Sequence, residues 1–356
     1  MGSAVASADP RPLDHVEISL TDSECADVRG RLAEFARASN DLPLDSEDLL
    51  ADAEVAGKVL PDRLVRALRG FRRGGNDTGA LLIRNVPTDT ALPPTPHDGY
   101  SGHWTEVPVA TFAQLAVVSQ LGEVIAYADE KAGNLIQDVV PVRGAEARQE
   151  NTGTVYLELH TENGFHPHKP DFITLLCLRP DHGRASHTVV GGAAEVLPEL
   201  SAACTAALRR PEFRLRVSSS FGAGADLRTE PVAVLSGPVD SPEFLADFHT
   251  MEPLTGAAAA ALDELKAALL RSLRGARLDA GDLLVIDNRT AVHGRTPFTA
   301  RYDETDRWLR RCFAVSDLRR SRGVRSPGSR VCAPLAVIGL SGTHPRTEED
   351  ARCSSS

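Results

Sequence analysis

Short apolar runs separated by turn residues recur along most of the chain. Runs of this length that are rich in Val, Ile, Leu and Phe and bounded by Gly, Pro, Asp or Asn are typical of β-strands. The pattern predicts strands at residues 79–86, 124–128, 135–140, 172–178, 186–190, 213–217, 232–235, 282–287 and 308–315.

Helical spacing of apolar residues is found near the start of the chain and in a few later stretches. Thr21 and Glu24 form an S/T-x-x-E capping signature ahead of apolar residues at helical spacing, so a helix should begin there. The same spacing predicts helices at about residues 60–71, 109–121, 192–209 and 257–273. Many short strands with helices set apart from them favour an α+β fold, with a double-sheet core and helical buttresses, over alternating βαβ units.

The two ends of the chain differ from its middle in composition. Residues 1–14 are small, polar and contain proline, which predicts disorder. From residue 316 onward Arg, Ser, Pro and Gly dominate, so residues 331–356 are expected to form a surface segment that is partly disordered. Because β-rich enzymes often build one core at this length, we predict a single domain over residues 15–330.

Composition and charge narrow the class of protein. An apolar content of 42% with 25% charged residues is typical of a soluble globular protein, and a net charge of −10 argues against a nucleic-acid surface. The first residues lack the basic and apolar regions of a signal peptide, and no stretch of about 18 uncharged apolar residues occurs, so neither secretion nor membrane insertion is expected. The six cysteines are scattered without a C-x-x-C pair, which indicates reduced thiols in the cytoplasm.

The candidate chemistry begins in the stretch Leu-Glu-Leu-His-Thr-Glu-Asn-Gly at residues 157–164. On a β-strand, residues two apart project from the same face, so His160 and Glu162 can point into one cavity. Far downstream, His293 follows the strand-like run 282–287. Two neutral imidazoles and one carboxylate are the ligand set of non-haem Fe(II) oxygenases.

Other interpretations of the H-x-E triplet compete with this one. Such a triplet also arises by chance around histidines that bind no metal. A helical zinc protease site would need H-E-x-x-H, which is absent. A zinc deaminase uses H-x-E with a non-ligand glutamate and a P-C-x-x-C sequence downstream, and that sequence is absent too.

Two arginines strengthen the oxygenase interpretation. Arg307 and Arg311 follow His293 by 14 and 18 residues and, four apart on a predicted strand, share one face. Guanidinium groups pair bidentately with carboxylates, so this face suits anionic ligands. An outer-face salt bridge is the alternative for either arginine, but the rest of the strand is apolar apart from Arg310 on the opposite face, which favours an inward role.

The H-T-E triplet, the distal histidine and the arginine 14 residues beyond it resemble the clavaminate synthase-like branch of the Fe(II)/2-oxoglutarate dioxygenases. That branch includes the asparagine oxygenase and the arginine β-hydroxylases of peptide-antibiotic biosynthesis. The resemblance covers roughly residues 79–318. It implies a double-stranded β-helix, or jelly-roll, core over that range, with flanking helices and a lid insertion.

The resemblance also implies roles for individual residues. The iron ligands would be His160, Glu162 and His293, and the residues that hold 2-oxoglutarate would be Thr188 and Arg307. Iron would then keep open positions for 2-oxoglutarate and dioxygen. The residues around an amino-acid substrate would be Glu130, Asn151, Glu162, Asp247 and Arg311.

Within that substrate set, the resemblance assigns the α-carboxylate to Arg311 and the α-amino group to Glu130, with Glu162 also facing the amino group. Asp247 would lie on the lid. The plainer alternatives are that Asp247 caps a loop and that Glu130 and Asn151 are solvated turn residues. These alternatives remain open from the sequence.

The function implied is hydroxylation of a free L-amino acid, at Cβ because the clamp on the α-groups brings that carbon nearest the iron. The arginine hydroxylases of the branch carry two acidic residues in the lid, whereas His249 and Leu245 flank Asp247 here. A single acid suits a side-chain amide, an ornithine or lysine ammonium, or an arginine held less completely. An oxygenase acting on a carrier-bound amino acid or small peptide, and a jelly-roll binding protein without turnover, are the alternatives; the oligomeric state is not predicted.

Overall fold

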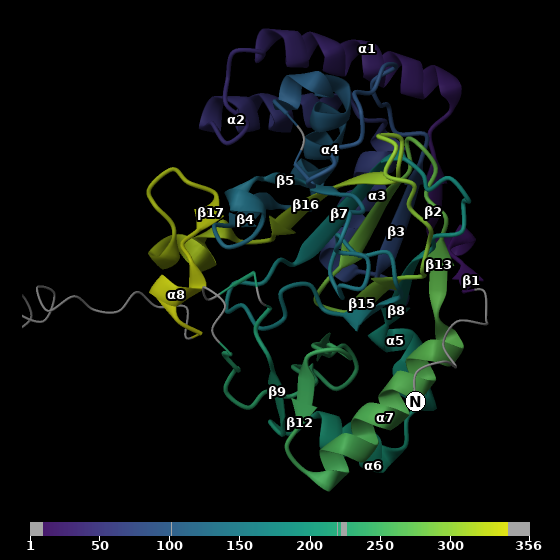
Figure 1. The fold of residues 1–356 in the computed structure, drawn as a ribbon, viewed down its shortest axis with the longest axis vertical. Coiled ribbons are helices and arrows are strands. Elements are labelled where there is room, and N and C mark those ends of the chain that lie inside the picture. Colours follow the sequence, from purple (N-terminus) through teal and green to yellow (C-terminus); the bar gives the residue numbers. More distant parts are fainter. Residues whose placement is uncertain (1–9, 101, 219, 222–225, 341–356) are drawn as a thin grey trace, which may run out of the picture.

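The computed structural model describes residues 10–100, 102–218, 220–221 and 226–340, which form a mixed α/β fold on two β-sheets (Figure 1). The larger sheet has the order β17-β4-β16-β7-β14-β3-β2, with β5 paired to β16. Its strands are β2 (Glu17–Ser19), β3 (Ala80–Arg84), β4 (Glu123–Tyr127), β5 (Ile136–Val139), β7 (Phe172–Arg179), β14 (Leu283–Asp287), β16 (Trp308–Val315) and β17 (Val331–Cys332).

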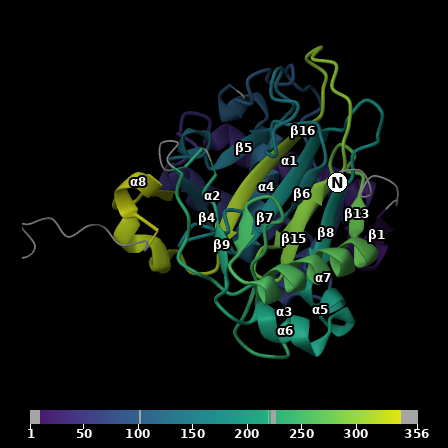
Figure 2. The same ribbon diagram turned by 60° about the horizontal axis from the view of Figure 1, so that its bottom comes forward.

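The smaller sheet has the order β1-β13-β8-β15-β6, and Figure 2 shows these strands side by side. Its strands are β1 (Arg11–Pro12), β6 (Leu157–His160), β8 (Thr188–Gly192), β13 (Arg274–Ala276) and β15 (Ala291–Arg295). Two short pairs lie in the insertion between β8 and β13. They are β9 (Phe213–Leu215) with β12 (Met251–Pro253), and β10 (Leu235–Ser236) with β11 (Glu243–Phe244).

Alternate side chains of the larger sheet enter two different cores. Leu82 of β3 and Leu284 of β14 belong to an inner core that also contains Val190 of the smaller sheet. Leu81 and Leu283, one position away, belong to an outer core shared with the N-terminal helices. Because successive strand residues face opposite ways, a continuous apolar run indicates a strand buried on both faces. The strands β3 and β14 were predicted correctly from such runs.

Four helices cover the outer face of the larger sheet and lie above the strands or behind them in Figure 1. They are α1 (Asp22–Ala38), α2 (Glu47–Ala56), α3 (Asp62–Gly74) and α4 (Pro108–Leu121). The start of α1 is as predicted, since the Thr21 hydroxyl accepts from the backbone N–H of Glu24, and the Glu24 carboxylate accepts from the N–H of Thr21.

The remaining long helix, α7 (Gly256–Ser272), contacts β8 of the smaller sheet. Gly191 permits this approach, because a Cβ there would lie 2.6 Å from Leu269 of α7. The single helix predicted at residues 192–209 is wrong, and the segment divides into α5 (Ala193–Val196), η5 (Leu197–Glu199) and α6 (Ala202–Leu208). Pro198 lies at the break and lacks the N–H that a continuous helix needs.

Short helical turns complete the described elements. They are η1 (Asp14–Val16), η2 (Gly57–Val59), η3 (Trp104–Glu106), η4 (Lys131–Gly133), η7 (Leu318–Val324) and α8 (Leu335–Ile338). Among the described residues, no helix is both long and apolar enough to cross a lipid bilayer.

Two described segments near the ends of the chain, residues 10–14 and 331–340, contain short strands. Within residues 1–14, expected to be disordered, β1 pairs with β13 and Leu13 is buried in the inner core. Within residues 331–356, expected at the surface, β17 extends the larger sheet beside β4, and Leu335 is buried. Disorder is therefore wrong for residues 10–14, which long-range strand pairing orders, whereas the partly disordered surface segment at residues 331–356 stays a prediction. Residues 1–9 and 341–356 lie outside the described part of the chain.

Candidate active site

Two strands of the smaller sheet bring His160 and His293 together. Antiparallel pairing of β6 with β15 sets the two residues directly opposite each other, and their ring centroids are 4.4 Å apart. Nδ1 of His160 lies 2.9 Å from the carbonyl oxygen of Glu158. Because a carbonyl only accepts hydrogen bonds, the proton belongs on Nδ1, and Nε2 is left with its lone pair free.

The sequence pattern predicted His293 just past a strand, but it lies within one. Residues 291–295 form β15, which the pattern did not predict because it is short and carries two charged or titratable side chains. Cross-strand pairing therefore fixes His293 on both sides, to His160 of β6 and to Val190 of β8.

Glu162 reaches the same place by a different route from the one predicted. The strand ends at His160, so Glu162 is not on a strand face but in the turn that follows. Asn288, fully buried after β14, holds that turn: its Oδ1 accepts from the N–H of Glu162 at 2.8 Å, and its Nδ2 donates to the carbonyl oxygen of Glu162 at 3.0 Å. Sequence reasoning missed Asn288, whose one signal was its place in the polar run that separates β14 from His293.

The three side chains form a compact group of potential ligands. One ligand atom from each of His160, Glu162 and His293 lies within 4.8 Å of the other two. Nε2 of His293 is 3.5 Å from Oε2 of Glu162, whereas its Nδ1 is buried without a hydrogen-bond partner among the described residues. Two imidazoles and one carboxylate gathered in this way suit a divalent iron ion.

The pKa values of His293 and Glu162 favour the protonation states that bind a metal. Burial and the neighbouring His160 lower the pKa of His293 to about 4, so its imidazole is neutral at physiological pH. Burial opposes ionisation of Glu162, but Arg311 and His293 outweigh it and hold the pKa of that carboxyl below its usual range. Metal ligation needs these states, a neutral imidazole and an ionised carboxylate.

Arg311 lies at the centre of a buried hydrogen-bonded network beside these ligands. Its Nη1 is 3.0 Å from Oε2 of Glu162, its Nη2 pairs with the carboxylate of Glu130, and its Nε donates to Oε1 of Gln137 at 3.1 Å. Asn163 donates to the other oxygen of Glu130 at 2.9 Å. Glu130 is thus buried and paired, and the alternative that it is a solvated turn residue is wrong.

Gln137 and Asn163 were not predicted from the sequence. Gln137 faces Arg311 because β5 pairs with β16 in a register that sets the two residues directly opposite each other. That register is not visible in either strand alone. Asn163 had a local signal, since it directly follows the H-T-E triplet.

The other two predicted substrate residues lie on the wall of the same cavity. Asn151 is half-buried in a turn, and Asp247 lies in a loop whose backbone pairs with His160. Oδ1 of Asp247 accepts from the backbone N–H groups of His249 and Thr250, both at 2.8 Å, so the loop cap suggested as an alternative is present. Its Oδ2 has no hydrogen-bond partner in the described part of the chain.

Another part of the cavity wall, the cationic part, is formed by Arg295, Arg307 and Thr188. Thr188, on β8, has a buried hydroxyl without a partner among the described residues, and Arg307 is buried with no carboxylate in ion-pair distance there. Burial lowers the pKa of Arg307. Arg295 lies beside them and was missed by sequence reasoning, although its spacing of two from His293 places both residues on one face of β15.

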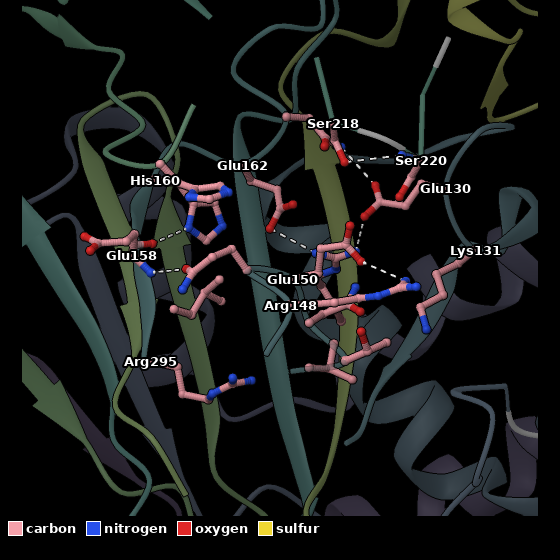
Figure 3. A pocket seen from close by; sticks show the side chains of 18 of the residues that line it. Glu130, Lys131, Arg148, Glu150, Glu158, His160, Glu162, Ser218, Ser220 and Arg295 are labelled. Carbon is pink, nitrogen blue, oxygen red and sulfur yellow. Dashed lines mark hydrogen bonds and ion pairs between the residues drawn. The ribbon is translucent and has the colours of Figure 1, made fainter. Parts of the chain in front are cut away.

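One cavity of about 1030 Å³ lies among these groups, and Figure 3 shows part of its lining. Its lining includes the proposed metal ligands, the cationic part and the Glu130–Arg311 pair. An amino acid and a dicarboxylate fit together in a space of this size.

The chain belongs to the taurine catabolism dioxygenase TauD, TfdA family, because the model of that family matches residues 45–313. The geometry of the site agrees with this membership. It is therefore an oxygenase, and the resemblance drawn from the H-T-E triplet is confirmed. It is 40% identical to the L-asparagine oxygenase of Streptomyces coelicolor over 315 residues, which covers 88% of this chain and 94% of that protein. It is 35% identical to the L-lysine 3-hydroxylase of Catenulispora acidiphila over 322 residues, covering 88% of this chain and 87% of that one.

The fold of this chain matches that of a solved structure. The structure of asparagine oxygenase in complex with Fe(II), 2S,3S-3-hydroxyasparagine and succinate superimposes with a TM-score of 0.85 at 38% identity. The match covers 89% of this chain and 99% of that one. The two sheets and their helices are thus arranged as in an iron-containing amino-acid oxygenase.

Proposed function

We propose that this enzyme uses Fe(II), 2-oxoglutarate and dioxygen to hydroxylate a free L-amino acid at Cβ, with L-asparagine the first candidate. The observation that carries the proposal is that one cavity joins a two-histidine, one-carboxylate group to both a cationic part and a buried Glu130–Arg311 pair. The similarity to an L-asparagine oxygenase supports the choice of substrate. The family resemblance drawn from the sequence also supports a role in supplying hydroxylated precursors for peptide antibiotics.

The residues present fit iron and 2-oxoglutarate. His160, Glu162 and His293 would hold the metal, and the unpartnered hydroxyl of Thr188 and the guanidinium of Arg307 would hold the distal carboxylate of 2-oxoglutarate. Bound together, iron and 2-oxoglutarate supply the activation of dioxygen that breaks a substrate C–H bond. The role of the chain is to hold these partners in place and to keep water out.

The Arg311 network is suited to an α-amino acid. The guanidinium would bind the α-carboxylate, and Glu130 and Glu162, both acceptors, would bind the α-ammonium group. With the α-groups held beside Glu162, a proposed metal ligand, Cβ is the carbon brought toward the metal. This arrangement supports hydroxylation at Cβ of a free rather than a carrier-bound amino acid, because a thioester has no α-carboxylate to bind.

Asp247 and Asn151 would select the substrate side chain. The unpartnered Oδ2 of Asp247 is an acceptor with a negative charge, so it favours a side chain that ends in N–H donors and disfavours a carboxylate. Asn151 offers both a donor and an acceptor. Together they match a side-chain amide, whose nitrogen donates and whose oxygen accepts.

The architectural part of the proposal is that the two facing sheets form a double-stranded β-helix, or jelly-roll, core within a single domain over residues 15–330. The shared inner core supports it. The insertion between β8 and β13, which carries Asp247, would act as the lid. Among the described residues, five cysteines are buried and form no disulfide, which supports a cytoplasmic location.

The proposal is tested by supplying purified protein with Fe(II), 2-oxoglutarate and air, and screening the proteinogenic amino acids and ornithine for succinate release. We expect L-asparagine to give the largest release and to gain one oxygen atom at Cβ, as shown by mass spectrometry and NMR. Release that does not depend on any free amino acid, from protein that has bound iron, would contradict the proposal.

A further inference from the structure

Two buried arginines, rather than one, line the cationic part of the cavity. Arg295 and Arg307 are 4% and 5% exposed, and both line the cavity. Their guanidinium groups lie over the same ring, that of Phe298, with guanidinium carbons 5.0 and 5.6 Å from its centroid. Neither has a carboxylate within ion-pair distance among the described residues. Two unneutralised cations buried side by side are costly unless a ligand brings negative charge.

Strand register directs Arg295 to the same face as the proposed co-substrate site. Arg295 is directly opposite Thr188 in the pairing of β15 with β8, and His293, two residues earlier, is opposite His160 of β6. Directly opposite residues project from the same side of a sheet, so the four side chains share one face. The side chains of Thr188 and Arg295 are therefore neighbours on this face of the sheet.

Arg295 is only partly satisfied where it lies. Its Nη2 donates to the carbonyl oxygen of Val155 at 3.1 Å, but its Nε is buried without a partner in the described part of the chain. Figure 3 shows the side chain extending from β15 into the cavity. A single carbonyl does not neutralise a guanidinium, which has five N–H donors and a full charge.

We infer that Arg295 is a second arginine of the 2-oxoglutarate site and sets the selectivity of this enzyme for a 2-oxo acid with a distal carboxylate. Arg307 and the Thr188 hydroxyl bind the distal carboxylate, and Arg295 adds a second cation beside them. The inference rests on the proposed placement of 2-oxoglutarate against Thr188 and Arg307.

The test compares two 2-oxo acids of equal length on the Fe(II)-loaded protein without oxygen. 2-Oxovalerate differs from 2-oxoglutarate only in ending with a methyl group, so the ratio of their dissociation constants reports the distal carboxylate alone. Titration calorimetry of Arg295→Met should show binding of 2-oxoglutarate weakened by about tenfold to a hundredfold, with 2-oxovalerate changed by less than about threefold. Arg295→Lys, which keeps the cation, should lie between the native protein and Arg295→Met.

Two other results would contradict the role of Arg295. If Arg295→Met weakens both acids by the same factor, the side chain acts only through packing, and if it weakens neither, it does not contact the ligand; either result overturns the inference. Should Arg295→Met fail to fold, Arg295→Gln takes its place, since it keeps an N–H donor for the Val155 carbonyl. Arg307→Met, measured in parallel, tests the placement itself: a silent Arg307→Met refutes the proposed co-substrate site, whereas an effect at Arg307 with none at Arg295 refutes only the role of Arg295.

Discussion

Arg311 donates from Nη1 to Oε2 of Glu162 across 3.0 Å, so the proposed substrate clamp and the proposed metal ligand are in direct contact. Both side chains are buried, and burial strengthens their attraction because little water screens it. The pair lowers the pKa of Glu162, as the guanidinium stabilises the ionised carboxylate. Anything that alters Arg311 therefore also alters the charge balance at the ligand group.

Replacement of Arg311 separates a free amino-acid substrate from a carrier-bound one. Arg311→Ala removes the partner of a substrate α-carboxylate and leaves Glu130 buried without its cation, a loss of about 3–5 kcal/mol for a broken buried pair. We expect kcat/KM for free L-asparagine to fall by at least about a hundredfold, measured by succinate release.

The matched control for Arg311→Ala is Arg310→Lys. Arg310 is equally buried but donates to Thr111 of α4, on the opposite face of β16. Its replacement should lower the melting temperature while leaving KM for the amino acid within about threefold of the native value. An Arg311→Ala enzyme that keeps its native kcat/KM would indicate a substrate without a free α-carboxylate.

Gln137 should act by orienting Arg311. Its Oε1 accepts from Nε of Arg311, so Gln137→Leu, similar in volume, leaves the guanidinium held by carboxylates alone. We expect KM for the amino acid to rise by about tenfold, the equivalent of one charge-assisted hydrogen bond, with a smaller change in kcat. A proportional loss in kcat with KM unchanged would mean that Gln137 does not act through substrate binding.

Asp247 should determine whether an amide or a carboxylate side chain is accepted. Asp247→Asn keeps the acceptor that caps the loop through His249 and Thr250 but removes the negative charge. We expect the ratio of kcat/KM for L-asparagine over L-aspartate to fall by at least about tenfold, since a substrate carboxylate is no longer repelled. An unchanged ratio would show that Asp247 is only a loop cap.

His166 should make the fold less stable in acid. Burial, assisted by His168, lowers the pKa of His166 to about 3, below the ordinary value of 6.5 for histidine. Between these values the unfolded chain binds a proton that the folded protein does not, so the free energy of unfolding falls as the pH decreases from about 6.5 toward 3.

Urea unfolding of the metal-free protein at several pH values measures this contribution. His166→Phe keeps a ring beside Tyr127 but cannot be protonated, so stability should decline less steeply, by up to about 1.4 kcal/mol per pH unit. Equal slopes for the variant and the native protein would place the acid sensitivity elsewhere.

The sequence predicted best where the information is local. The buried strands β7, β14 and β16 follow from continuous apolar runs, and the start of α1 follows from its capping box. The association of His160 with Glu162 was predicted, but from a strand that ends at His160, two residues before Glu162. The turn that brings Glu162 into place depends on Asn288, which is 126 residues away.

What the sequence did not predict depends on strand pairing. Arg295 reaches Thr188, and Gln137 reaches Arg311, only through the registers of β15 with β8 and of β16 with β5. Register is set by the hydrophobic pattern of a whole sheet together with its turns, so neither partner alone reveals it. The same reason explains why the two-residue strands β1 and β17 were not predicted.

Oxidation of 2-oxoglutarate by this enzyme should be coupled to hydroxylation of a free amino acid at Cβ. The most direct measurement is the amount of succinate and of hydroxylated product formed from L-asparagine under ¹⁸O₂, by mass spectrometry, with His160→Ala as the control. Equal amounts of the two products, with ¹⁸O on Cβ and neither formed by His160→Ala, are the result expected. Succinate formed from the iron-loaded enzyme without a hydroxylated amino acid, for asparagine and for every other free amino acid tried, would contradict it.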